Sequence, residues 1–140
     1  MHTSMHIAQK ILEKGRNLSI VDMTPMKLLK LVYISHGWML GLYDRPLVSE
    51  DVEAWQYGPV IPELYREIKS YKDQPVDSLN PRSNASLDAD ENNIIDQVLS
   101  KYGQFSGFKL SNITHAKGTP WHTVWHQCQY DVIPNPLIRD

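Results

Sequence analysis

The segment from Thr24 to Leu42 constrains the fold more than any other part of this sequence. Thr24 followed by Pro25 is a strong helix start, because threonine can cap the first turn and proline fits the first helical position. Apolar side chains then cover most sides of the predicted helix: Leu28, Leu29, Leu31, Val32, Tyr33, Trp38, Met39 and Leu40. Since a helix that is apolar on most sides is normally buried, we predict a central helix over residues 24–42.

A narrow stripe of this helix lacks apolar side chains. Lys27 and Lys30 lie on it, followed by Gly37 and Gly41 one turn apart. We expect the lysines to face water and the glycines to let a neighbouring backbone approach closely. The helix is short for a membrane span and carries two lysines, so no membrane association is expected.

The remaining sequence predicts five more helices and two irregular segments. The helices are expected at residues 4–17, 62–71, 88–102, 106–114 and from 119 to about 128. A polar loop is expected at residues 72–87 and an extended tail at residues 130–140. The sequence therefore predicts a mainly α fold, with residues 1–140 forming a single compact domain of about six helices around the central one.

Residues 47–57 are compatible with two structures. Apolar residues surround a possible turn at residues 49–51, so a short β-hairpin and an extended connector fit about equally well. The next segment, Tyr57–Pro62, holds two prolines and one glycine and predicts a rigid turn.

The amino-acid composition, the net charge and the cysteine count exclude several classes of protein. With 41% hydrophobic and 21% charged residues among 140, the chain is globular rather than disordered. The net charge of −2 gives no basic excess, so binding to nucleic acid is not expected. Cys128 is the only cysteine, which rules out an internal disulfide. The N-terminus lacks the layout of a signal peptide, and we expect a cytoplasmic protein.

Histidine spacing suggests one enzymatic alternative. His122 and His126 are four residues apart and could place two metal ligands on one helix face, with His115 or Cys128 as the third. That arrangement would suit a metal-assisted hydrolase. No carboxylate lies between the two histidines, as the helical zinc-protease motif requires. We therefore favour structural or surface roles for them and expect no metal, no cofactor and no catalytic residue.

A cysteine nucleophile is a further alternative. Cys128 could pair with a histidine, but no strained turn presents it. It is predicted to lie in the last helix beside Trp125, where buried structural cysteines are common. The sequence does not indicate an enzyme.

Four tryptophans in 140 residues are many, and they mark the most informative segments. We interpret Trp38 and Trp121 mainly as core residues. Trp55 and Tyr57 adjoin the proline-containing segment, where a binding role is about as plausible as a structural one. Tryptophan and tyrosine are typical anchors of protein interfaces.

Several motifs together resemble the Panacea antitoxin domain, a family that includes SocA-like antitoxins and many phage-associated proteins. The motifs lie at residues 27–33, 36–38, 45–47, 53–60, 64–65, 102–103, 110–111, 114–115 and 120–121. The strongest reads Glu53-Ala54-Trp55-Gln56-Tyr57-Gly58-Pro59-Val60. The resemblance extends over residues 5–126, and the combination is more specific than any single motif.

The resemblance implies a mostly helical antitoxin that neutralises a partner toxin protein by direct binding. SocA-like members also act as adaptors that hand the toxin to a Clp-type protease, so such a protease is a second implied partner. The family supplies no catalytic residue. The candidate partner-binding residues are Trp55, Tyr57, Gly58, Pro59, His115 and Trp121. Self-association into a homo-oligomer remains open at this point.

Overall fold

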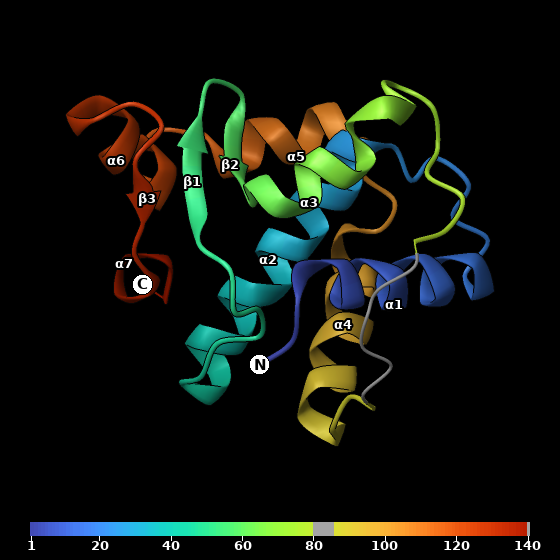
Figure 1. Cartoon of the computed structure of the whole chain (residues 1–140). Coiled ribbons are helices and arrows are strands. Elements are labelled where there is room, and N and C mark those ends of the chain that lie inside the picture. Colours follow the sequence, from blue (N-terminus) through green and yellow to red (C-terminus); the bar gives the residue numbers. More distant parts are fainter. Residues whose placement is uncertain (80–85, 140) are drawn as a thin grey trace.

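The computed structural model describes residues 1–79 and 86–139, so the predicted polar loop at 72–87 lies partly outside the described residues. The elements follow in this order: α1 (Ser4–Asn17), α2 (Pro25–Tyr43), β1 (Val52–Trp55), β2 (Gly58–Val60), α3 (Pro62–Ile68), a short 3-10 helix η1 (Lys69–Tyr71), α4 (Ala89–Tyr102), α5 (Gly107–Thr114), α6 (Pro120–Gln127), β3 (Val132–Ile133) and α7 (Asn135–Arg139) (Figure 1). The fold is mainly helical, as predicted.

Helix α2 lies at the centre of the molecule. It packs against α1, α3, α4, α5, α7 and strand β2 (Figure 1). Leu28, Leu31 and Val32 have no exposed surface, and they belong to one continuous apolar core with residues of all these helices. The predicted central helix is therefore confirmed, and most other elements contact either α2 or the sheet beside it.

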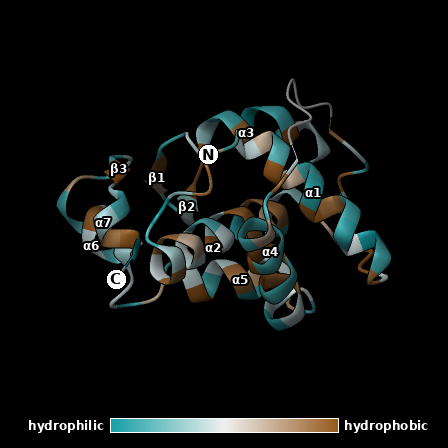
Figure 2. Cartoon of the chain, turned by 90° about the horizontal axis from the view of Figure 1, so that it is seen from below, coloured by the Kyte–Doolittle hydropathy of each residue, from teal (hydrophilic) through white to brown (hydrophobic). Residues whose placement is uncertain are grey.

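Local cap chemistry explains where the helices begin. The Thr24 hydroxyl accepts a hydrogen bond from the backbone N–H of Lys27, and Pro25 occupies the first turn. Asp88 and Glu91 form a reciprocal capping box at the start of α4. Helices α1 and α4 alternate hydrophobic and hydrophilic segments along their length (Figure 2), as expected of helices with one buried face.

The prediction that Lys27 and Lys30 face water is wrong. Their exposed fractions are 0% and 2%. The Lys27 ammonium donates to the Asp22 carboxylate and to the Gly103 carbonyl, both at 2.6 Å. These partners let the charge stay buried, because a buried ammonium must be paired or hydrogen-bonded.

At the two glycines of the same stripe, a neighbouring segment approaches α2 closely, as predicted. A Cβ atom at Gly37 would lie 3.4 Å from the Ile138 side chain, and one at Gly41 would lie 3.6 Å from the Arg139 carbonyl. Helix α7 therefore approaches α2 closely at the two glycines. The prediction of an extended tail at residues 130–140 is wrong where α7 forms, and β3 precedes it.

The hairpin alternative for residues 47–57 is confirmed, but its position is shifted. Strands β1 and β2 pair antiparallel through Trp55↔Gly58 and Ala54↔Pro59, so the turn lies at residues 56–57 and not at 49–51. Residues 58–60 are thus a strand rather than part of the predicted rigid turn. Because β2 is an edge strand, Pro59 is tolerated without an N–H group. Strand β3 pairs with the other side of β1, giving the order β2-β1-β3.

Candidate partner-binding surface

The fold brings the six predicted site residues together from three parts of the chain. Four of them lie in or beside the hairpin turn, His115 follows α5, and Trp121 lies in α6. The Trp121 indole N–H donates to the Trp55 carbonyl at 2.5 Å, and the His115 and Trp121 rings meet edge to face at 5.3 Å. The Ser111 hydroxyl of α5 donates to the Tyr57 carbonyl. The hairpin is thus fastened to both α5 and α6.

Exposure separates these six residues into two groups. Tyr57 is 65% exposed, and Trp55 and His115 are half-buried. Gly58, Pro59 and Trp121 are buried. In this structure only the first group can touch a partner directly. Gly58 and Pro59 are buried within strand β2 of the hairpin, and Trp121 contacts the hairpin from α6.

A row of aromatic rings continues the surface on both sides of Trp55. Trp55 meets Tyr65 of α3 at 5.1 Å and Tyr130 at 6.2 Å between ring centroids. Tyr130 then meets Trp125 at 5.3 Å, and Trp125 stacks on Trp121 at 5.5 Å. The sequence-based site did not include Tyr65 and Tyr130. Only the pairing of β3 with β1 brings Tyr130 to the hairpin, and no local motif indicates that pairing.

A concave site of about 520 Å³ lies beside this row, and we name it the hairpin pocket. Its lining residues come from α2, the hairpin, α3, η1 and the segment after α6: Pro25, Met26, Leu29, Lys30, Trp55, Gln56, Tyr57, Val60, Tyr65, Lys69, Lys72 and Tyr130. The Lys30 ammonium donates to the Pro59 carbonyl at 3.2 Å. Burial lowers the pKa of Lys30 from 10.5 to about 8, because desolvation disfavours the charged form.

Two residues of the pocket have backbone conformations that L residues rarely adopt. Tyr130 has φ 65° and Lys72 has φ 57°. The backbone N–H of Tyr130 donates to the Ala54 carbonyl at 2.8 Å, which holds the tyrosine in place. Strained positions of this kind persist where the surrounding structure over-determines them, and they cluster at binding sites.

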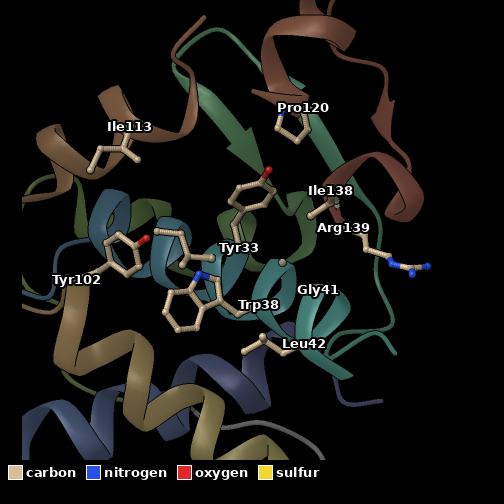
Figure 3. Close-up of a pocket in the computed structure, with 11 residues that line it drawn as sticks. Tyr33, Trp38, Gly41, Leu42, Tyr102, Ile113, Pro120, Ile138 and Arg139 are labelled. Atoms are coloured by element: carbon tan, nitrogen blue, oxygen red, sulfur yellow. The ribbon is translucent and has the colours of Figure 1, made fainter. Parts of the chain in front are cut away.

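A second groove lies on another side of α2 and is lined mainly by apolar side chains (Figure 3). We name it the α2 groove; its volume is also about 520 Å³. Its lining residues are Tyr33, Ile34, Gly37, Trp38, Gly41, Leu42, Tyr102, Ile113, Pro120, Ile138 and Arg139. The half-buried Trp38, which we interpreted mainly as a core residue, meets Tyr102 edge to face at 6.0 Å, and the Lys101 ammonium lies 5.5 Å from its ring centroid. Arg139, at the rim formed by α7, is paired with Asp44 at 2.9 Å.

The geometry does not assemble the ligand set of the metal-hydrolase alternative. The rings of His122 and His126 are 4.2 Å apart, but His115 turns toward the Ser111 carbonyl and Trp121. Within residues 1–79 and 86–139, no three His, Cys, Asp or Glu side chains are grouped so that they could hold a metal ion. Cys128 is exposed just after α6 and is not the buried cysteine we expected.

The described part of the chain also contains no helix with both the length and the apolar character needed to span a bilayer. Taken together, the fold and the surface define a small helical domain that displays an aromatic, preorganised hairpin beside a pocket. Exposed tyrosine and tryptophan side chains are enriched at protein–protein interfaces.

Comparison with known proteins identifies the family. The family model described as "Antitoxin SocA-like, Panacea domain" matches residues 28–122. A curated relative, Antitoxin SocA of Caulobacter vibrioides (strain NA1000 / CB15N), is 31% identical over 128 residues, covering 84% of this chain and 68% of the relative. No solved structure matches the chain. The chain belongs to the SocA-like Panacea antitoxin family, and the resemblance seen in the motifs is confirmed.

Proposed function

We propose that this protein is an antitoxin that neutralises a toxin protein by binding it directly through the hairpin surface, and that it has no catalytic activity. Family membership supports the antitoxin role. The observation that favours this surface is the large exposed area of Tyr57 at the hairpin turn, next to the half-buried Trp55. Exposed aromatic residues on a rigid support are typical interface anchors.

Preorganisation makes this surface suited to tight binding. The carbonyl groups of Trp55 and Tyr57 are held by Trp121 and Ser111, and the Trp55 indole N–H donates to the Glu53 carboxylate at 3.0 Å. A partner therefore meets side chains that are already ordered. Less conformational entropy is lost on association than with a mobile loop.

Growth rescue tests the proposal. This chain and the product of the gene adjacent to its own are expressed separately and together, and growth is scored in each case. Binding between the two proteins is measured by pull-down. We expect toxicity from the neighbour alone and rescue on co-expression. Tyr57→Ala should weaken binding by about 2 kcal/mol, as for an interface hot spot. Phe108→Ala is the matched control. It removes an exposed aromatic side chain that lies on α5, outside the hairpin, and the variant should bind at full strength.

The outcomes are distinct. No binding and no toxicity would overturn the proposed function. Binding that Tyr57→Ala and Trp55→Ala leave at full strength, in folded variants, would place the interface elsewhere, and the α2 groove would be the next surface to test.

Neutralisation can also proceed by delivery of the toxin to a Clp-type protease, and we extend the proposal to that route. The toxin's half-life after translation is stopped separates the two routes. A short half-life that needs both the antitoxin and the protease would establish an adaptor. A toxin that is inhibited but long-lived would establish stoichiometric blocking alone.

A further inference from the structure

The hairpin pocket concentrates positive charge on a protein whose net charge is −2. Lys30, Lys69 and Lys72 all line it, and no aspartate or glutamate is among its lining residues. Among the described residues, none of the three lysines is within ion-pair distance of a carboxylate. The first turn of α2, with Pro25 and Met26, also lines the pocket, and the positive end of a helix dipole favours an anion.

Lys30 is the unusual member of this group. Its exposed fraction is 2%, yet among the described residues its ammonium makes one hydrogen bond, to the Pro59 carbonyl. An ammonium group has three donors, so two are left for another acceptor. The other buried lysine, Lys27, has both a carboxylate and a carbonyl within 2.6 Å. Burial lowers the pKa of Lys30 to about 8, and a carboxylate bound beside the ammonium would favour its charged form.

We propose that the hairpin pocket is an acceptor site for a partner's acidic side chain, in which Lys30 binds the carboxylate and Trp55, Tyr65 and Tyr130 contact the apolar residue beside it. This inference rests on the proposed function, because the segment that enters belongs to the bound toxin. The pocket's volume of about 520 Å³ is sufficient for two neighbouring side chains. Its continuity with Tyr57 makes it part of the same surface.

A carboxylate fits the pocket better than a phosphate does. Phosphate sites are commonly built from glycine-rich loops, successive backbone N–H groups and arginine forks. The lining of this pocket contains neither glycine nor arginine, and Pro25 removes one N–H from the helix start. A carboxylate has two oxygens, which matches the two donors that Lys30 has left.

Peptide titration tests the pocket without the toxin. The full chain, labelled with nitrogen-15, is titrated by NMR with the blocked peptide acetyl-Leu-Glu-Leu-amide and with its glutamine isostere. We expect the glutamate peptide to shift the Trp55 indole signal with a Kd of about 1 mM and the isostere to bind at least about tenfold more weakly. Lys30→Met should abolish the difference between the peptides, whereas Lys101→Met, a control on α4 near Trp38, should preserve it.

A second variant tests the pocket even if Lys30→Met does not fold. Lys69 and Lys72 are exposed, so Lys69→Ala/Lys72→Ala should fold normally and weaken the glutamate peptide about two- to threefold through lost long-range attraction. Equal binding of the two peptides, absence of binding up to about 20 mM, or an unchanged preference in Lys30→Met would overturn the inference. So would adenosine monophosphate, used as the phosphate probe, binding more than about tenfold tighter than the glutamate peptide.

The two proposals can fail separately. If the neighbour's product neither harms growth nor binds, the proposed function fails, and the peptide titration still reports on the pocket. If rescue succeeds but Lys30→Met binds the toxin at full strength and the peptides do not differ, only the carboxylate site is rejected.

Discussion

The imidazole Nε2 of His36 lies 3.0 Å from the side-chain oxygen of Asn135, although 99 positions separate the two residues. On its other side, the His36 Nδ1 accepts hydrogen bonds from the backbone N–H groups of Leu47 and Val48, both at 3.3 Å. Because Nδ1 is an acceptor, the proton lies on Nε2, which donates to Asn135. The neutral ring therefore joins the central helix to the segment before β1 and to α7.

Acid should weaken this junction. Burial lowers the pKa of His36 in the folded protein, so below about pH 6.5 the unfolded chain binds a proton that the folded chain does not. The contribution of the neutral His36 to the free energy of unfolding is therefore complete above that pH and decreases as the pH falls. His36→Ala should cost about 3 kcal/mol at pH 7 and remove this component of the pH dependence. Urea unfolding at pH 7 and pH 5 measures both effects.

His126 provides the matched control, because it is exposed on α6. His126→Ala should leave the free energy of unfolding within about 0.5 kcal/mol of wild type. If His36→Ala retained the wild-type slope between pH 7 and pH 5, the slope would arise from other groups.

Lys30 should add a second increase of stability with pH, in the alkaline range. Its folded pKa of about 8 lies below the unfolded value of 10.5, so between these values the unfolded chain binds more protons. The free energy of unfolding should therefore rise with pH, approaching a total of about 3 kcal/mol. Burial raises the pKa of Tyr33, which lowers stability above pH 10, so the rise is measured between pH 8 and pH 10.

Lys30→Met should flatten this rise with pH. It should also stabilise the protein at pH 7, because an apolar side chain of similar volume replaces a buried charged one. The pocket's other titratable groups, Lys69, Lys72 and the tyrosines, are retained in the variant. Denaturant unfolding at several pH values gives the two curves. Parallel curves for variant and wild type would contradict the assignment, and Lys101→Met should follow wild type.

The sequence predicted what depends on local chemistry. Helix α2 follows from a cap, a proline and an apolar pattern within one segment, and the capping box of α4 is equally local. The burial of Lys27 was not predictable in this way, because its carbonyl partner, Gly103, is 76 residues away. A polar residue in an apolar pattern indicates either water or a distant partner, and periodicity does not distinguish them.

The candidate site shows the same division. The segment from Trp55 to Pro59 is continuous in sequence, so it could be identified as a motif. Tyr65 and Tyr130 reach Trp55 only through the packing of α3 and the pairing of β3 with β1. Strand β3 has two residues, too few to give a recognisable alternation.

Trp121 should stabilise the hairpin through its indole N–H. Trp121→Phe keeps most of the ring packing but leaves the Trp55 carbonyl without this donor. We expect a loss of about 1–2 kcal/mol in the free energy of unfolding, measured with urea. Trp125→Phe, one turn further along α6, should cost less because Trp125 is half-buried and stacks on Trp121 without donating to the hairpin. Equal losses in both variants would assign the effect to packing and not to the hydrogen bond.

Gly58 should tolerate no side chain, for two reasons that a matched variant separates. Its φ of +126° is unfavourable for L residues, and an added Cβ would lie 3.0 Å from the Lys30 Cε and 3.4 Å from the Thr114 hydroxyl oxygen. Gly118 also has a positive φ, +88°, but an added Cβ there has no atom within 4 Å. Gly118→Ala should therefore lose about 1 kcal/mol through backbone strain alone, and Gly58→Ala at least about 1 kcal/mol more. Thermal and urea unfolding of both variants measures the difference. A loss in Gly58→Ala no larger than in Gly118→Ala would mean that the Lys30 side chain moves aside without cost, so that the hairpin does not hold the ammonium in place.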